Sequence, residues 1–246
     1  MSELFVHNPN PKKAYSPRKK NDFYPTPYGC ALASVRWLKT TYGINPSIIL
    51  DPGAGTGVWG KACREVFSID NINPFIVGVE LDKAHADNRV ADNDWQGYNQ
   101  WVTEDYLEYT PYRCDGFDLI VGNPPYSKAD EFINKSMTLV RKNNSKKLWI
   151  IAFLLKLSYL GSQYRGKELF VKNPPLEVVA YSRRPSFSGD GKTDGCEYGF
   201  FIWSNYNEWL RWYMDVYMEE GTHLNWLDWD YHPEDFKNKE LKGGIR

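Results

Sequence analysis

The chain has 246 residues, of which 42% are hydrophobic and 16% are aromatic. This length is sufficient for one α/β domain with a full core and is short for two. No apolar run approaches the length that crosses a bilayer, and the basic N-terminus lacks the apolar segment of a signal peptide. We therefore expect a cytoplasmic protein with no membrane partner.

The formal net charge is −1, but the charges are unevenly distributed. Residues 141–192 contain eleven Lys or Arg and three acids, whereas residues 205–235 contain eight acids and one Arg. A basic face opposite an acidic face would orient a polyanion such as a nucleic acid. The alternative is a solvated surface without a partner, because charge runs often have no ligand.

The cysteines do not form a pattern typical of a disulfide framework or a zinc site. Cys30, Cys63, Cys114 and Cys196 are scattered, without a Cys-x-x-Cys pair, and the four His residues are not clustered. We expect reduced, structural cysteines and no bound metal.

Strand-like and helix-like segments alternate along the chain. The patterns predict helices over 30–42, 58–67 and 130–140, and strands over 47–50, 75–79, 101–106, 117–121, 148–155, 176–181 and 198–203. Such alternation is typical of a mostly parallel, doubly wound sheet, in which ligands bind at the carboxyl ends of the strands.

A glycine-rich turn follows the first predicted strand, with the sequence Asp51-Pro52-Gly53-Ala54-Gly55-Thr56-Gly57. Its glycines allow the backbone to approach a ligand, and the next helix offers free N–H groups to a carboxylate. The turn lacks the Gly-x-Gly-x-x-Gly spacing of dinucleotide sites and the Lys of a P-loop, which argues against NAD and ATP. Glu80 ends the second strand, where an acid can bind both ribose hydroxyls of a nucleoside; Asp82 is the competing candidate.

A second turn, Asn123-Pro124-Pro125-Tyr126, follows the fourth predicted strand. The Asn123 amide oxygen and the Pro124 carbonyl can both accept hydrogen bonds, because the Pro-Pro pair removes N–H donors from the turn. A planar amine stacked on Tyr126 could donate to both acceptors, which favours the tetrahedral nitrogen formed during nucleophilic attack. The turn alone is also compatible with an ordinary strand end.

Together, the two turns resemble the amino-methyltransferases that use S-adenosylmethionine, and in particular the small phage-type DNA N6-adenine methyltransferases. The glycine-rich motif precedes Asn-Pro-Pro-Tyr, as in the gamma arrangement of that family. The resemblance implies a Rossmann-like class I methyltransferase fold, with a mostly parallel seven-stranded sheet and helices on both faces. It implies methyl transfer to N6 of an adenine flipped out of DNA, in a bacterial or phage-infected cell.

The resemblance also implies an organisation and a set of site residues. A catalytic domain (22–204) would follow a flexible basic arm (1–21) and precede an acidic, aromatic-rich extension (205–246). The catalytic residues would be Asn123, Pro124, Pro125 and Tyr126. S-adenosylmethionine would contact Thr26, Pro27, Asp51, Pro52, Gly53, Ala54, Gly55, Thr56, Gly57, Glu80, Leu81, Asp105, Tyr106 and Asn123. The DNA substrate would contact Tyr126, Phe187, Arg183, Arg184 and Lys156.

Several of these assignments have alternatives. Thr26 and Pro27 also suit the N-cap and first residue of a helix, Glu104 competes with Asp105, and Phe187 can be a buried loop anchor. The Asn-Pro-Pro-Tyr turn also occurs in enzymes that methylate adenine in RNA or a glutamine amide in proteins, and the chain could be an inactive binding subunit. The basic span favours a nucleic acid over a protein without separating DNA from RNA. Monomer and homodimer remain equally open.

Overall fold

The computed structural model describes residues 23–69, 73–85, 97–112, 115–141, 147–187, 195–209 and 221–228. The predicted N-terminal arm and most of the predicted C-terminal extension therefore lie outside the described residues. The strands are β1 (Ile48–Pro52), β2 (Phe75–Glu80), β3 (Gln100–Thr103), β4 (Leu119–Gly122), β5 (Ile150–Lys156), β6 (Glu177–Tyr181), β7 (Tyr198–Ser204) and β8 (His223–Leu227). The longer helices are α1 (Tyr28–Tyr42), α2 (Val58–Ser68) and α4 (Ala129–Leu139), and the short helical turns are η2 (Tyr126–Lys128), η3 (Leu157–Leu160), α5 (Gln163–Arg165) and η4 (Gly166–Phe170).

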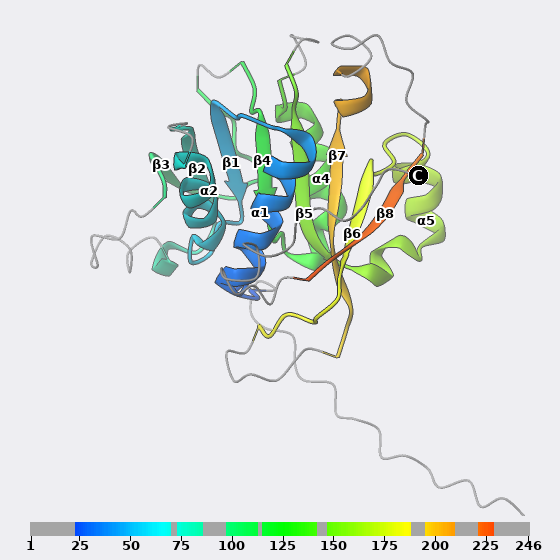
Figure 1. Cartoon of the computed structure of the whole chain (residues 1–246). Helices are drawn as coiled ribbons and strands as arrows, with labels where there is room; N and C mark the ends of the chain where they lie inside the picture. The colour runs from blue at the N-terminus through cyan, green and yellow to red at the C-terminus, as the bar shows by residue number, and fades with distance from the viewer. Residues whose placement is uncertain are drawn as a thin grey trace, which may run out of the picture.

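These strands form one mostly parallel sheet in the order β3-β2-β1-β4-β5-β7-β6-β8 (Figure 1). The pairs from β3 to β5 are parallel, and β7 runs antiparallel to both of its neighbours, β5 and β6. The strand order reverses between β1 and β4, which is where an open α/β sheet forms a ligand-binding crevice. The predicted doubly wound α/β architecture is confirmed.

Helices cover both faces of the sheet, so two hydrophobic cores form. Val35 of α1 and Val66 of α2 pack with Ile49 of β1 on one face, whereas Ile133 of α4 packs with Leu50 on the other. Neighbouring residues of β1 thus enter opposite cores, because successive side chains of a strand point to opposite faces. Among the described residues, no helix is both long and apolar enough to span a membrane.

The predicted seven-stranded sheet has an eighth strand. β8 pairs in parallel with β6, from Glu177 opposite His223 to Tyr181 opposite Leu227, so the sheet continues beyond the domain boundary predicted at residue 204. Asn225 Nδ2 donates to Glu177 Oε1 over 2.5 Å. The sequence pattern missed β8 because it is an edge strand in which Trp226 remains 65% exposed, so its residues do not form an apolar run.

The start of α1 differs from the capping that was considered for Thr26. Pro27, with φ −59° and ψ 136°, is the N-cap and makes no side-chain cap hydrogen bond, and the helix begins at Tyr28. Thr26 is therefore one residue too early to cap the helix, and Pro27 is not its first helical residue. The predicted stop is confirmed: Gly43 has φ 61° and donates from its N–H to the carbonyl of Lys39 over 3.0 Å.

Candidate active site

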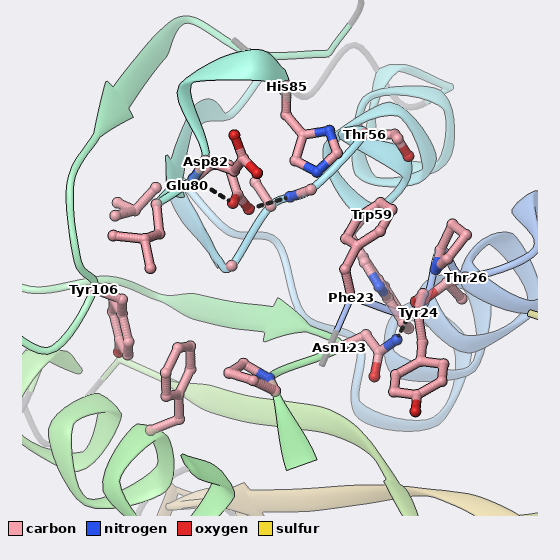
Figure 2. A pocket seen from close by; sticks show the side chains of 18 of the residues that line it. Phe23, Tyr24, Thr26, Thr56, Trp59, Glu80, Asp82, His85, Tyr106 and Asn123 are labelled. Carbon is pink, nitrogen blue, oxygen red and sulfur yellow. Dashed lines mark hydrogen bonds between the residues drawn. The ribbon is translucent and has the colours of Figure 1, made fainter. Parts of the chain in front are cut away.

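A cavity of about 600 Å³ opens beside the glycine-rich turn (Figure 2). This size is within the usual range for sites that bind small molecules and cofactors. Of the residues predicted to contact a cofactor or to act in catalysis, the following line it: Thr26, Gly53, Ala54, Gly55, Thr56, Glu80, Leu81, Asp105, Tyr106, Asn123 and Pro125. Pro27, Asp51, Pro52, Gly57, Pro124 and Tyr126 are not among its lining residues. The two sequence motifs therefore meet at one cavity.

The glycine-rich turn has the backbone conformation that requires glycine. Gly53, Gly55 and Gly57 have φ of 68°, 52° and 80°, in the left-handed region that side chains disfavour. A Cβ added to Gly55 would lie 2.8 Å from a ring carbon of Phe23. Because Phe23 also lines the cavity, the absence of a side chain at Gly55 lets the N-terminal segment close against the turn.

Both carboxylate oxygens of Glu80 accept main-chain hydrogen bonds, one of them from the glycine-rich turn. Oε2 accepts a hydrogen bond from the N–H of Gly55 over 2.7 Å, and Oε1 accepts from the N–H of Asp82 over 2.8 Å. Each carboxylate oxygen has a second lone pair, so ribose binding by Glu80 stays a prediction. Asp82 also lines the cavity.

Asp51 stabilises the glycine-rich turn from outside the cavity. Its carboxylate is completely buried and accepts a hydrogen bond from the hydroxyl of Tyr98. The same hydroxyl accepts from the N–H of Gly60 in α2 over 3.0 Å. The carboxylate thus links β1 to the helix that follows the glycine-rich turn, rather than lining the cavity.

Asn123 is fixed in one orientation at the wall of the cavity. Its Nδ2 donates to the main-chain carbonyl of Tyr24 over 2.8 Å, as Figure 2 shows. A carbonyl can only accept, so the other end of the amide must be the oxygen. Oδ1 is buried and receives no hydrogen bond from any described residue. The turn therefore presents a preoriented acceptor that lacks a donor.

Asp105 and Tyr106 line another part of the cavity. Asp105 Oδ1 accepts from the N–H of Leu107 over 3.0 Å, and Oδ2 pairs with Nζ of Lys128 at 3.4 Å. Glu104 does not line the cavity, so the preference for Asp105 agrees with the geometry. The hydroxyl of Tyr106 contacts Oγ of Ser136 at 2.8 Å, and burial raises the Tyr106 pKa.

Trp59 is a wall residue that the sequence patterns did not predict. It is in the first turn of α2, is 3% exposed, and stacks on Phe200 with ring centroids 5.6 Å apart. Its indole Nε1 is buried and has no acceptor among the described residues. Other lining residues missed by the sequence patterns are Phe23, Tyr24, Pro25, Val58, Val79, His85, Ser127, Lys128 and Phe132.

The aromatic residues predicted to hold a substrate are already in contact with Tyr24. The rings of Tyr24 and Tyr126 are stacked, with centroids 5.6 Å apart and an interplanar angle of 22°. Phe187 is 5% exposed and lies edge-on to Tyr24 at 5.9 Å and to Tyr198 at 5.0 Å. The alternative role of Phe187 as a buried loop anchor therefore fits its surroundings, and stacking on a base stays a prediction.

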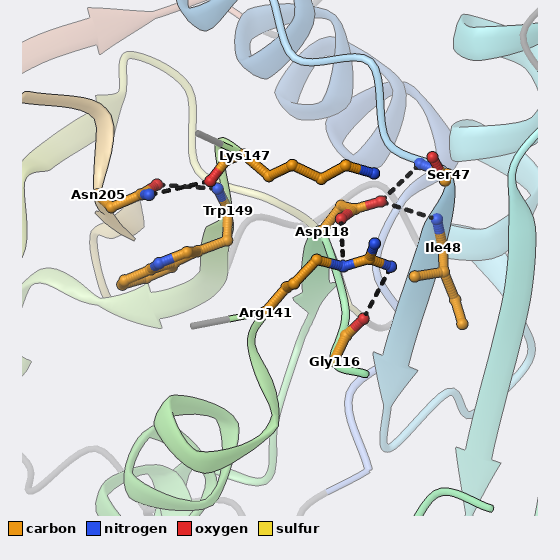
Figure 3. A network of polar contacts seen from close by, with 8 residues as sticks. All are labelled: Ser47, Ile48, Gly116, Asp118, Arg141, Lys147, Trp149 and Asn205. Carbon is orange, nitrogen blue, oxygen red and sulfur yellow. Dashed lines mark hydrogen bonds and ion pairs between the residues drawn. The ribbon is translucent and has the colours of Figure 1, made fainter. Parts of the chain in front are cut away.

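The basic span is partly neutralised by the acids of the described chain. Arg184 pairs with Glu197 at 2.7 Å, and Arg183 and Arg184 are exposed residues that do not line the cavity. Lys156 Nζ lies 5.3 Å from the ring centroid of Tyr126. Arg141 forms an ion pair within the fold (Figure 3), in which its Nε lies 3.1 Å from Oδ1 of Asp118.

None of the described cysteines is among the residues that line this cavity. Cys30 and Cys63 are buried free thiols, Cys196 is a half-buried one, and Cys114 lies outside the described residues. Burial raises the Cys30 pKa to about 12. No group of three His, Cys, Asp or Glu among the described residues is arranged to hold a metal ion.

Comparison with known proteins gives partial relatives. No protein-family model matches the chain. The type II methyltransferase M.CvrRI of Paramecium bursaria Chlorella virus XZ-6E is 36% identical over 153 residues, which cover 55% of this chain and 37% of the viral protein. The type II methyltransferase M.XamI of Xanthomonas campestris pv. amaranthicola is 32% identical over 104 residues, or 41% of this chain and 19% of that protein. A tRNA1(Val) (adenine(37)-N6)-methyltransferase of Bacteroides thetaiotaomicron is 38% identical over 81 residues, or 32% of each chain.

Solved structures give the fold. A Listeria monocytogenes protein assigned to the class I S-adenosylmethionine-dependent methyltransferases matches with a TM-score of 0.61 and 16% identity, over 82% of this chain and 65% of that one. The methyltransferase subunit of a type I restriction-modification system from Streptococcus thermophilus matches with a TM-score of 0.58 and 16% identity, over 73% and 44%. The chain has the class I methyltransferase fold.

Within this methyltransferase fold, the cavity lies at the strand-order reversal, as expected for the fold. The chain spans only 37%, 19% and 32% of the lengths of the three curated relatives that it matches.

Proposed function

We propose that the protein transfers the methyl group of S-adenosylmethionine to N6 of an adenine in DNA. The observation that carries this proposal is the amide of Asn123, whose buried oxygen is oriented by Tyr24 and has no donor among the described residues. An exocyclic amine would supply that donor. The partial likeness to two type II methyltransferases supports methyl transfer, and the partial likeness to a tRNA adenine-N6 methyltransferase supports an adenine amine as the acceptor.

The main cavity suits S-adenosylmethionine. Its volume of about 600 Å³ and its glycine-rich turn accommodate a ligand close to the backbone. The indole N–H of Trp59 offers a buried donor that a carboxylate could satisfy, which would offset the cost of leaving it unpaired, about 1–3 kcal/mol. Glu80 and Asp105 offer carboxylates to hydroxyl and amino groups. When bound, S-adenosylmethionine supplies an electrophilic methyl group on a sulfonium centre.

Asn123 then acts on the nucleophile. Its Oδ1 accepts one N–H of the adenine amine, and the carbonyl of Pro124 is the proposed acceptor for the other. These contacts draw the nitrogen towards the tetrahedral geometry of the transition state. The methylated amine afterwards releases its extra proton to water, so no strong base is needed.

The base must leave its stack to reach Asn123. Flipping a base out of a duplex costs a few kcal/mol, and stacking on aromatic side chains returns about 1–3 kcal/mol per base. Tyr126 is the proposed stacking partner, with Phe187 as a second. Tyr24 now covers one face of Tyr126 at 5.6 Å, so this ring has to shift before a base occupies that face.

RNA is the second candidate substrate. The observation that favours it is the 38% identity to the Bacteroides thetaiotaomicron tRNA methyltransferase, although this covers only 32% of the chain. The amine chemistry is the same in both nucleic acids. The choice between them therefore depends on contacts to the backbone and not on Asn123.

The test is transfer of a tritiated methyl group to DNA, RNA and protein in parallel, followed by nucleoside or amino-acid analysis of the labelled product. We expect N6-methyladenine from DNA with the wild-type chain. Asn123→Ala should lose transfer by about 10²–10³-fold, the usual loss for one transition-state hydrogen bond, with nearly unchanged binding of S-adenosylmethionine.

Asn134→Ala is the matched control, because Asn134 is an exposed residue of α4. Labelled RNA alone would move the assignment to the second candidate, and labelled glutamine in protein would replace both. Cofactor binding without methyl transfer to any of the three substrates would indicate that the chain is an inactive binding subunit. Full activity of Asn123→Ala would rule out the proposed role of its amide.

A further inference from the structure

A second, smaller cavity adjoins the Asn-Pro-Pro-Tyr turn on the side of β5. Its volume is about 160 Å³, and it is lined by Tyr126 together with Lys156, Ser158, Tyr159 and Arg165. β5 pairs in parallel with β4, with Phe153 opposite Gly122. The residue at the end of β5, Lys156, is thereby brought beside the turn that follows β4.

Two cations of this cavity are not neutralised by the described protein. Lys156 and Arg165 form no ion pair with any acid among the residues that the structure describes. Asp130 is nearby and keeps its negative charge while it accepts a hydrogen bond from the hydroxyl of Tyr159, but neither it nor any other acid is among the residues that line the cavity. The charged side chains of the lining are therefore both positive, which suits an anion.

Arg165 is held in place with most of its donors unused. Its Nε donates to the carbonyl of Tyr159 over 2.8 Å, and its guanidinium lies 4.2 Å from the centroid of the Tyr159 ring. Its main-chain N–H donates to Oγ of Ser162 over 3.3 Å. A guanidinium has five N–H donors, so the described contact at Nε leaves the terminal nitrogens to bind an anion bidentately.

The ligand must fit both the charge and the neighbouring Tyr126. Lys156 Nζ is 5.3 Å from the Tyr126 ring centroid, so an anion bound here lies within one nucleotide of a base stacked on Tyr126. The hydroxyl of Ser158 adds a neutral donor. A phosphodiester oxygen pair meets these requirements, because Arg and Lys are its usual partners in protein–nucleic acid contacts.

We propose that this cavity binds a backbone phosphate of the nucleic-acid substrate next to the target adenine, with Arg165 as its principal ligand and Lys156 as the second. The proposal rests on the proposed function and extends it, since Arg165 was not among the predicted substrate residues. The phosphate contact would fix the position of the nucleotide relative to Tyr126 and would carry no sequence information.

The experiment compares Arg165→Gln with Lys167→Gln, a matched loss of one positive charge at an exposed lysine of η4. Fluorescence anisotropy measures binding of a labelled DNA oligonucleotide of mixed sequence, and of the RNA with the same sequence, from about 50 to 200 mM salt. Loss of one phosphate contact should reduce the slope of log affinity against log salt by about 0.7–0.9. We expect this reduction in Arg165→Gln and less than half of it in Lys167→Gln.

Kinetics separate a positioning contact from a folding defect. Arg165→Gln should raise the KM of the nucleic acid about tenfold, with S-adenosylmethionine binding unchanged, and Arg165→Lys should retain the salt slope but lose part of the affinity. If Arg165→Gln fails to fold, Lys156→Gln takes its place with the same expected slope. Equal slopes for wild type and Arg165→Gln, or equal losses in Arg165→Gln and Lys167→Gln, would overturn the phosphate subsite.

The outcomes also distinguish the two proposals. Wild-type transfer to DNA or RNA, with a salt slope that Arg165 does not influence, removes the subsite and leaves the proposed function. Absence of both transfer and binding with either nucleic acid removes both proposals. A reduced slope with RNA but not with DNA would assign the phosphate to RNA.

Discussion

The main-chain carbonyl oxygen of Tyr24 lies 2.8 Å from Nδ2 of Asn123, and this contact decides which end of the amide is left to act on a substrate. Asn123→Asp tests the consequence, because a carboxylate has no N–H to donate to Tyr24 and would place an oxygen against an oxygen. We expect methyl transfer to fall by at least about 10²-fold. Cofactor affinity should change little.

Single-turnover transfer and S-adenosylmethionine titration measure the two effects separately for Asn123→Asp. Wild-type turnover in this variant would show that the orientation of the side chain does not matter.

Removal of the Tyr24 ring, in contrast, is expected to improve the use of a DNA substrate. This ring stacks on Tyr126 at 5.6 Å, and an aromatic pair of this kind contributes about 0.5–1.5 kcal/mol. Tyr24→Ala removes a competitor for the base while retaining the main-chain carbonyl, so we expect the KM of a DNA substrate to fall about two- to tenfold. Tyr24→Phe keeps the stack and should keep the wild-type KM.

Steady-state kinetics with a single oligonucleotide are sufficient for this comparison. A higher KM in Tyr24→Ala would mean that Tyr24 itself binds the base.

Much of the fold could be predicted from local sequence. The apolar runs of β1, β2 and β4 to β7 are buried strands, and their alternation with helices is enough to predict a doubly wound sheet. β8 could not be found in this way, because an exposed edge strand has no apolar run, and its pairing to β6 depends on Glu177, which is 46 residues away from His223 along the chain.

The cavity was predictable only where its residues belong to motifs. Gly55 and Asn123 stand in recognisable turns, so their meeting at one cavity follows from the parallel order of β1 and β4. Tyr24 carries no such signal: it is 99 residues from Asn123 in sequence, and its main-chain carbonyl makes the decisive contact. Trp59 resembles any apolar residue of a helix until its indole N–H is seen to be buried without a described partner.

The glycine-rich turn gives a third prediction, through Gly55. A side chain there would be strained at φ 52° and would lie 2.8 Å from the Phe23 ring. A left-handed conformation costs a non-glycine residue about 1–2 kcal/mol, and the displaced Phe23 would alter the cavity wall. We expect Gly55→Ala to weaken S-adenosylmethionine binding by at least about tenfold.

Gly195→Ala is the matched control, because a Cβ at Gly195 meets nothing within 4 Å. Isothermal titration of the cofactor into both variants gives the comparison. Equal affinities would show that the turn does not approach the ligand.

The contacts of Asp118 predict that removal of its side chain lowers the stability of the fold without weakening the binding of S-adenosylmethionine. Asp118 lies before β4, whereas Asn123 follows the same strand, so the two residues are at opposite ends of β4. Oδ2 of Asp118 accepts from the N–H groups of Ser47 and Ile48 over 2.8 and 3.2 Å, and Oδ1 pairs with Arg141 (Figure 3). Removing one partner of a buried ion pair typically costs about 3–5 kcal/mol.

We therefore expect Asp118→Ala to lower the free energy of unfolding by about this amount in denaturant titrations, while the folded fraction retains its affinity for S-adenosylmethionine. Glu168→Ala is the comparison, because its ion pair with Lys172 is exposed, with side chains 56% and 66% accessible, and such a pair contributes at most about 1 kcal/mol. If Asp118→Ala weakened cofactor binding as much as Gly55→Ala does, the two ends of β4 would be energetically coupled. The glycine-rich turn could then not be treated as an independent site.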